Sequence, residues 1–278
     1  MKQLLQADLY RMVKSKLTMV LLILSAAFPL FTVLIYAGLR AISSIGEEIM
    51  DSVGLLTANT VIGSAYSLTN NIGLVIPVMA GILVCTDFTS GTLRNKVVAG
   101  NPRTKIYFSH LIVSILYSVV MITIYVLFTA GFALLMLPYK SGFAVNVVRE
   151  YVFWAVTGTM SFVFMATVST FFAMTFRSIA PTILLTLLVT FTLLILSSTL
   201  SFTDYSNVRH LVYFIPTFSG QFFSLTGGSL IGTAINALVG GVSESKEVIF
   251  AEGIGSFVFF GAVNTVLGVI LFCKRDLK

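Results

Sequence analysis

The chain has 278 residues, of which 57% are hydrophobic and only 10% are charged, and its mean hydropathy is +0.98. A soluble domain carries about 25% charged residues, so the composition excludes a soluble globular protein and predicts an integral membrane protein. The net charge is +6, but the basic residues lie between apolar segments and form no patch with interleaved aromatics. We therefore expect no nucleic-acid partner.

The first 18 residues have the pattern of an amphipathic helix. Its apolar residues recur at helical spacing: Leu4, Leu5, Leu9, Met12, Val13 and Leu17. Its polar residues fall between them: Lys2, Gln6, Arg11, Lys14 and Lys16. Such a helix lies on the cytoplasmic membrane surface with its cations near anionic head groups. A simple topology anchor and a part in gating both fit this pattern.

Apolar segments of about 17–25 residues can cross a bilayer. Six segments are candidates: Met19–Leu39, Asn71–Thr86, Ile106–Leu137, Tyr151–Phe176, Pro181–Leu200 and Ile254–Cys273. The second is short unless the polar residues before it join its helix. We expect an all-α integral membrane protein with six transmembrane helices, forming a single transmembrane domain over residues 1–278.

The orientation follows from the Lys and Arg residues of the flanks and loops. These 17 residues divide 12 to 5 between the two sides. Because the side richer in Lys and Arg is cytoplasmic, we expect both termini in the cytoplasm. The same rule places there the polar segment between the second and third spans, residues 87–105.

This polar segment has the sequence signals of a short helix. Gly100 can adopt the left-handed conformation that ends a helix, and Pro102 prevents its continuation. Two groups of side chains are predicted on opposite faces: Leu93, Val97 and Val98 on one, and Arg94, Asn95 and Lys96 turned away from it. A basic helix at the cytoplasmic face is suited to docking a cytoplasmic partner.

Two segments are expected on the outer side. Residues 40–70 are polar and predict a loop with a short helix. Residues 202–253 are too apolar for a simple loop, and their apolar runs of 13 and 10 residues are shorter than a span. We expect a re-entrant pair of helices there, turning near Gly227 and Gly228, before the last span.

Motifs for chemistry on this chain are absent from the sequence. It holds no Walker A loop, no His-Glu-x-x-His and no Gly-x-Ser-x-Gly, so we expect no enzyme and no catalytic residues. The expected topology puts His110 and His210 on opposite faces, which argues against a shared metal site. Cys85 and Cys273 lack metal-ligand spacing. The span interiors are almost free of the ionisable residues that mark ion-coupled carriers, so a pump of this kind needs energy from another subunit.

The fifth span carries a stripe of hydroxyl side chains: Thr182, Thr186, Thr190, Ser197 and Ser201. These residues fall on roughly the same helix face. The stripe fits a translocation path. The stripe could equally reflect helix packing, with each hydroxyl bonded to the carbonyl four residues earlier.

The polar segment also resembles a known family. An acidic residue followed by Gly-Thr-Leu-Arg-Asn-Lys, a short helix and Arg-Thr-Lys is similar to the ABC-2 family of ATP-binding-cassette exporter permeases. Those positions are Asp87, Gly91, Thr92, Leu93, Arg94, Asn95, Lys96, Arg103, Thr104 and Lys105. The amino-terminal segment Leu5–Lys16 resembles that family's interface helix.

The resemblance implies a permease that dimerises, as a homodimer or a heterodimer, and binds two copies of a cytoplasmic ATPase subunit. ATP and Mg would bind the partner subunit, and this chain itself would bind no cofactor. Residues 87–105 would form the coupling helix, Arg177 a smaller second contact, and the Thr182–Ser201 stripe part of the substrate path.

The resemblance also implies a cargo and a location. The Gly-Thr-Leu-Arg-Asn-Lys segment looks most like that of permeases exporting peptides, such as antimicrobial or cytolytic peptides. The apolar spans also suit a hydrophobic or amphipathic cargo. We expect a multi-pass protein of a bacterial plasma membrane. Export of a drug or polysaccharide remains open, as does a non-transporting role as a sensor or immunity component.

Overall fold

The computed structural model describes residues 2–42, 57–68, 71–139, 145–201, 213–216, 218 and 246–274. The elements in this part of the chain are all α-helices. They are α1 (Lys2–Lys14), α2 (Lys16–Ile42), α4 (Ala58–Ala65), α5 (Asn71–Thr89), α6 (Thr92–Val98), α7 (Arg103–Met136), α8 (Val145–Phe176), α9 (Ile179–Ser201) and α13 (Lys246–Lys274). The all-α fold expected from the sequence is confirmed.

Five of the described helices are long and apolar enough to cross a membrane: α2, α7, α8, α9 and α13. They coincide with five of the six expected spans. The remaining expected span corresponds to α5, which has 19 residues and ends at Thr89, three residues later than the sequence indicates. The six-span count therefore stays a prediction.

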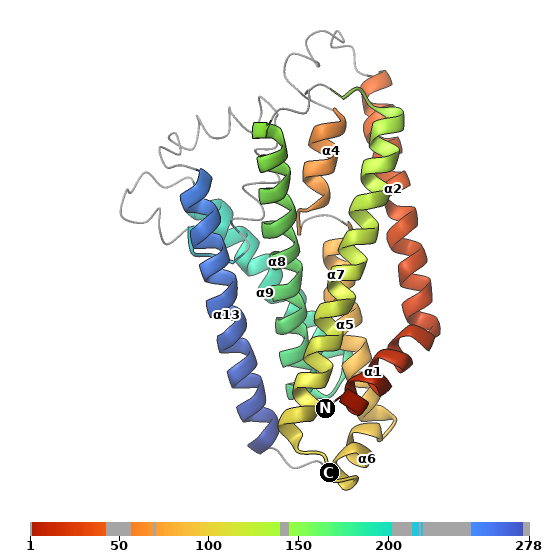
Figure 1. Cartoon of the computed structure of the whole chain (residues 1–278), viewed down its shortest axis with the longest axis vertical. Helices are drawn as coiled ribbons and strands as arrows, with labels where there is room; N and C mark the ends of the chain where they lie inside the picture. The colour runs from red at the N-terminus through yellow and green to blue at the C-terminus, as the bar shows by residue number, and fades with distance from the viewer. Residues whose placement is uncertain are drawn as a thin grey trace.

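Most of the long helices stand side by side, and the short helix α4 lies among them (Figure 1). At one end lie α1, α6, the start of α7 and the finish of α13; we call this the α6 end. The guanidinium of Arg103 donates a hydrogen bond of 3.0 Å to the carbonyl of Cys273, which joins the start of α7 to the finish of α13. The described chain thus begins and ends at the α6 end.

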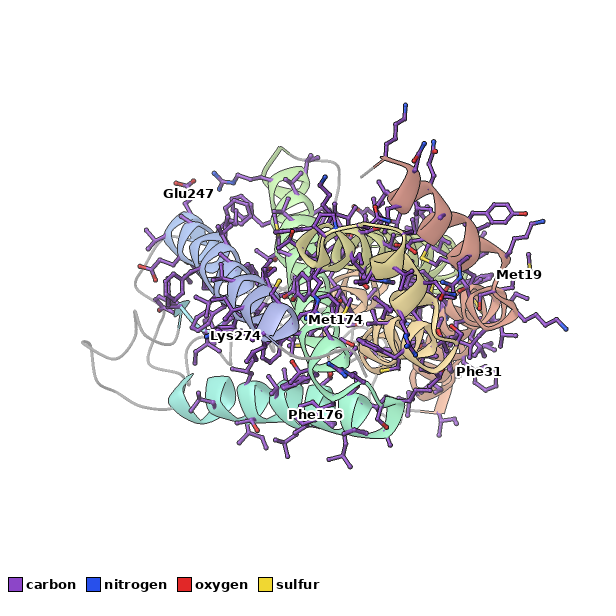
Figure 2. The ribbon with its side chains drawn as sticks, turned by 90° about the horizontal axis from the view of Figure 1, so that it is seen from below. Met19, Phe31, Met174, Phe176, Glu247 and Lys274 are labelled. Atoms are coloured by element: carbon purple, nitrogen blue, oxygen red, sulfur yellow. The ribbon has the colours of Figure 1, made fainter. Side chains whose placement is uncertain are left out.

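Helices α7 and α8 form the centre of the bundle, whereas α2, α9 and α13 lie outside them. The largest apolar core gathers side chains such as Tyr117, Met121, Phe162 and Met165 from these two central helices. The outer helices leave large apolar side chains uncovered. Phe31 on α2 is 68% exposed, and it lies at the edge of the bundle seen from the α6 end (Figure 2). An apolar exterior of this kind suits hydrocarbon rather than water.

The short helix expected between residues 40 and 70 is present as α4. It is buried rather than solvated, because Ala58 and Val61 belong to an apolar cluster with residues of α2 and α7, and Ala65 is fully buried. In Figure 1 it lies above α5, between α2 and α8. The Tyr66 ring that follows it lies against Gly158 of α8, where any side chain would collide with it.

The last helix begins earlier than the sequence predicts. Instead of starting at Ile254, α13 starts at Lys246, so residues 246–253 belong to a helix and not to a re-entrant segment. Apolar residues in its first turns explain the difference, since Ile249 is fully buried against Trp154 and Tyr213. Most of the expected re-entrant pair, including Gly227 and Gly228, lies outside the described residues.

Candidate functional site

Helix α6 is a seven-residue helix held between two glycines in the left-handed conformation. Gly91 precedes it with φ +67° and Gly100 follows it with φ +83°. Asn101 reinforces the end of the helix by donating its side-chain amide to the carbonyl of Lys96 at 3.1 Å. The predicted stop at Gly100 is therefore confirmed, and α7 begins directly after Pro102.

The two faces of α6 differ from the prediction at two residues. Arg94 and Asn95 point outward and Leu93 is buried, as expected. Lys96, however, turns into the bundle, and only 14% of its side chain is exposed. Val98, expected on the apolar face, is 79% exposed. The prediction for these two residues is wrong because Lys96 pairs with buried carboxylates of other helices, a contact that spacing within α6 cannot indicate.

The Lys96 ammonium is the centre of a polar cluster at the α6 end. Its Nζ lies 2.6 Å from Oδ1 of Asp8 on α1, and 3.0 Å from Oδ2 of Asp87 on α5. It also lies 3.2 Å from Nε2 of His110 on α7. One side chain of α6 therefore contacts three other helices, and we name Asp8, Arg11, Asp87, Lys96, Ser109 and His110 the Lys96 cluster.

Arg11 and Ser109 complete the cluster. The Arg11 guanidinium lies 2.6 Å from Oδ1 of Asp87 and donates to Oγ1 of Thr92 at 3.2 Å. The Ser109 hydroxyl donates to Oδ2 of Asp8 at 2.7 Å. Two carboxylates thus face two cations, so the permanent charges balance. A balanced and hydrogen-bonded arrangement is what makes buried charges tolerable.

Burial and neighbouring charge act in opposite directions on Asp8. Burial of its carboxyl would raise the pKa, but His110, the Lys96 ammonium and the Ser109 hydroxyl favour the charged form. The net effect holds the pKa of Asp8 below its ordinary value. Asp8 is therefore a carboxylate at neutral pH, and the pairing with Lys96 persists.

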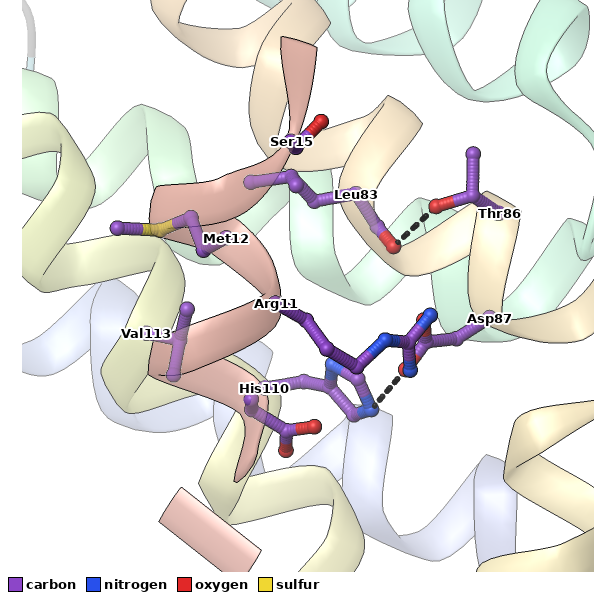
Figure 3. Close-up of a pocket in the computed structure, with 9 residues that line it drawn as sticks. Arg11, Met12, Ser15, Leu83, Thr86, Asp87, His110 and Val113 are labelled. Atoms are coloured by element: carbon purple, nitrogen blue, oxygen red, sulfur yellow. Dashed lines mark hydrogen bonds and ion pairs between the residues drawn. The ribbon is translucent and has the colours of Figure 1, made fainter. Parts of the chain in front are cut away.

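A pocket of about 110 Å³ opens beside the Lys96 cluster. Arg11, Asp87 and His110 line it together with apolar residues such as Met12 and Val113 (Figure 3). Asp8, Asp87 and His110 bring possible metal ligands within 4.8 Å of one another. The Lys96 ammonium already contacts all three groups, so it stands where a bound cation would stand.

Sequence reasoning missed Asp8, Arg11 and His110 as members of this site. A signal existed for Asp8, which lies four residues from Leu4 and four from Met12 on the apolar face of α1. A carboxylate on an apolar stripe needs a partner when that stripe is buried. The partner itself could not be found from spacing, because Lys96 is 88 residues away.

The other predicted coupling residues lie around this end. Lys105 is exposed at the start of α7. Arg177 lies in the turn between α8 and α9 with φ +58°, and its guanidinium stands 5.7 Å from the centre of the Phe88 ring on α5. Phe88 in turn meets Phe272 of α13 edge to face. Arg177 thus belongs to the packing between α5 and the α8–α9 turn.

The threonines of α9 are buried within the chain. Thr182, Thr186 and Thr190 are at most 1% exposed. Their hydroxyls donate to the carbonyls four residues earlier at 2.7, 2.7 and 2.8 Å. This is the bonding that the packing interpretation requires. The side chains of Ser197 and Ser201 lie outside the described residues.

Comparison with known protein families and with curated proteins finds no match to this chain.

Proposed function

We propose that this chain is the permease subunit of an ATP-driven exporter, powered by two copies of a separate cytoplasmic ATPase and paired with a second permease copy. The proposal rests on the resemblance of the Asp87–Lys105 segment to coupling helices. It is supported by one structural observation: α6 presents Arg94 and Asn95 outward while Lys96 and Leu93 fasten it to the bundle.

A coupling helix needs both properties. An exposed face can bind a partner, and a buried face must pass the partner's movement to the spans. Lys96 bonds α6 to α1, α5 and α7 at distances of 2.6–3.2 Å. A rigid displacement of α6 therefore moves the ends of these helices with it, which is the kind of packed and hydrogen-bonded connection that transmits coupling.

The proposed topology places the α6 end in the cytoplasm. Basic residues gather at this end, including Arg94, Lys105 and Lys274, and the positive-inside rule assigns such an end to the cytoplasm. Helix α5 would be the sixth span: 19 residues at about 1.5 Å each reach about 28 Å, close to the hydrocarbon thickness of about 30 Å.

The cargo we propose is hydrophobic or amphipathic, with a peptide as the first candidate. The apolar exteriors of α2, α9 and α13 would let such a cargo approach from within the bilayer. ATP and Mg would bind the partner. The setting proposed for this assembly is a bacterial plasma membrane.

The test is purification of the tagged chain from its native membranes, with detection of a co-purifying subunit that carries a Walker A loop and hydrolyses ATP. Arg94→Glu reverses an exposed charge on the proposed docking face, so it should abolish co-purification while the protein stays folded. Arg149→Glu is the control for charge reversal: it breaks an exposed ion pair with Glu247 outside the α6 end and should leave binding intact. Wild-type binding and ATP hydrolysis in the Arg94→Glu variant would refute the docking face.

Transport needs its own measurement. Membrane vesicles containing the chain and its ATPase should accumulate a labelled amphipathic peptide only with ATP. ATPase binding without uptake of peptide, drug or polysaccharide probes would instead favour the non-transporting sensor.

A further inference from the structure

An apolar groove of about 400 Å³ runs between α7, α8 and α13. Its walls come mainly from Leu111 and Ile115 of α7, Phe164 of α8, and Phe257, Gly261 and Val266 of α13. The groove opens toward the outside of the bundle, since Val266 on its rim is 56% exposed. Its volume lies within the range of about 300–1,000 Å³ found for small-molecule sites.

The groove offers hydrocarbon to an occupant and almost no polar group. The hydroxyls of Thr167 and Thr265 in its wall are already bonded within their own helices, to the carbonyls of Phe164 at 2.7 Å and Gly261 at 2.8 Å. A ligand with hydrogen-bonding groups would lose its water there without compensation. A hydrocarbon chain would lose nothing.

Two exposed cations stand beyond the groove at the α6 end. Lys105 belongs to α7 and Lys274 to α13, the helices that form two of its walls. Along α7, Leu111 and Ile115 follow Lys105 by six and ten residues, or about 9 and 15 Å. Along α13, Val266 precedes Lys274 by eight residues, or about 12 Å. These distances match one leaflet, half of the hydrocarbon thickness of about 30 Å.

We propose that this groove binds one acyl chain of an anionic phospholipid, with the head group against Lys105 and Lys274. The inference rests on the chain spanning a membrane with its α6 end at the head groups, and not on the exporter function. Cationic side chains at a membrane surface attract anionic lipids. The apolar groove would therefore bind the acyl chain of such a lipid, and the two cations would bind its head group.

Charge also distinguishes the lipid from a second copy of the chain. In a two-fold symmetric dimer through this groove, each surface meets the same surface of the partner. With that two-fold axis along the membrane normal, the Lys105 and Lys274 residues of both copies would lie at the same end of the interface, where their positive charges would repel. An anionic head group is attracted by the same residues, which favours the lipid.

The test compares two lipids on the whole chain, purified in an uncharged detergent. Phosphatidylglycerol should raise the thermal unfolding midpoint more than phosphatidylcholine with identical acyl chains, and native mass spectrometry should show the retained phosphatidylglycerol. Gly261→Phe fills the groove and should abolish the shift. Gly131→Phe is the matched control, because both glycines have open space around them and Gly131 does not line the groove.

A second variant tests the head group without altering the groove. Lys105→Gln with Lys274→Gln should reduce the phosphatidylglycerol shift to that of phosphatidylcholine. Equal shifts for the two lipids on the wild-type chain, or a full shift in Gly261→Phe, would overturn the proposal. Conversion of a dimer to a monomer by Gly261→Phe, without any change in lipid response, would assign the groove to a contact between copies. Neither result depends on an ATPase, so the exporter proposal stands or falls separately.

Discussion

The ammonium of Lys96 lies 2.6 Å from the carboxylate of Asp8, although the two residues are 88 positions apart. This contact joins α6 to the amino-terminal helix α1. The amphipathic helix, for which the sequence left open a topology anchor or a part in gating, is therefore bonded directly to the proposed coupling helix. Movement of α6 would reach α1 as well as the spans.

Removing the Lys96 charge should destabilise the protein severely. Lys96→Met leaves Asp8 and Asp87 buried with one cation fewer, and breaking a buried pair in this way costs about 3–5 kcal/mol. Arg94→Met, on the exposed face of the same helix, should change stability by no more than about 0.5 kcal/mol. Thermal unfolding of the two variants in detergent measures the difference, and equal midpoints would contradict the cluster.

The charge balance of the Lys96 cluster predicts a rescue. Adding Asp8→Asn to Lys96→Met leaves Asp87 with Arg11 and restores neutrality. The double variant should therefore be more stable than Lys96→Met alone. A double variant that is less stable than either single variant would show that the two residues act independently.

The stability contributed by Asp8 should depend on pH. Its pKa in the folded protein lies below the ordinary value of 3.8, so its contribution is present above that value and is lost as the pH falls through the folded pKa. Asp8→Asn should accordingly be less stable than wild type at pH 7, with the gap narrowing below about pH 4. Melting curves of both proteins across this interval provide the measurement. A constant gap would show that the charge of Asp8 contributes nothing.

The backbone at Gly100 predicts opposite effects for two glycine substitutions. Gly100 has φ +83° with open space around it, so Gly100→Ala should cost about 1–2 kcal/mol through backbone strain alone. Gly131 lies inside α7, also in open space, and Gly131→Ala should stabilise by about 0.5–1 kcal/mol. Chemical or thermal unfolding of both variants measures the two changes in the free energy of unfolding. A change of the same sign in both variants would contradict this role for the backbone conformation.

The buried Thr186 hydroxyl separates the two interpretations of the α9 stripe. Thr186→Val keeps the shape and removes only a bond to the Thr182 carbonyl, so folding and expression should be little affected. If the stripe lines a path in the working assembly, peptide uptake by vesicles should fall while the unfolding midpoint stays constant. Unchanged uptake would support packing, and loss of expression would contradict both expectations.

Local signals in the sequence were sufficient for several features of the fold and site. Gly100 and Pro102 placed the stop of α6 correctly, because the left-handed conformation and the missing amide act on the chain next to them. Five long apolar helices were predicted correctly, because length and hydropathy are sufficient to identify a helix that could cross a membrane. Residues 246–253 were assigned to the re-entrant segment rather than to the last helix, because the burial of Ile249 against Trp154 and Tyr213 depends on contacts that the local sequence does not contain.

Tertiary contacts decided the features that were missed. Helix α6 has seven residues, about two turns, and of its three apolar residues only Leu93 is fully buried. Lys96 turns inward because Asp8 and Asp87 lie on other helices, and no periodicity within residues 92–98 contains that information. For the same reason His110 looked like an isolated residue of a span rather than a neighbour of Lys96.

The Lys96 cluster also has a consequence for the order of assembly during synthesis. All of its members lie within the first 110 residues, from Asp8 to His110. The apolar core at the same end needs Phe272, which is made near the end of translation. Since chains fold from the amino terminus as they emerge, the ionic contacts can close while α8, α9 and α13 are still unmade. The first part of the protein thus forms its own ionic contacts, and the later helices complete this end with the apolar packing of Phe272 and the hydrogen bond from Arg103 to the Cys273 carbonyl.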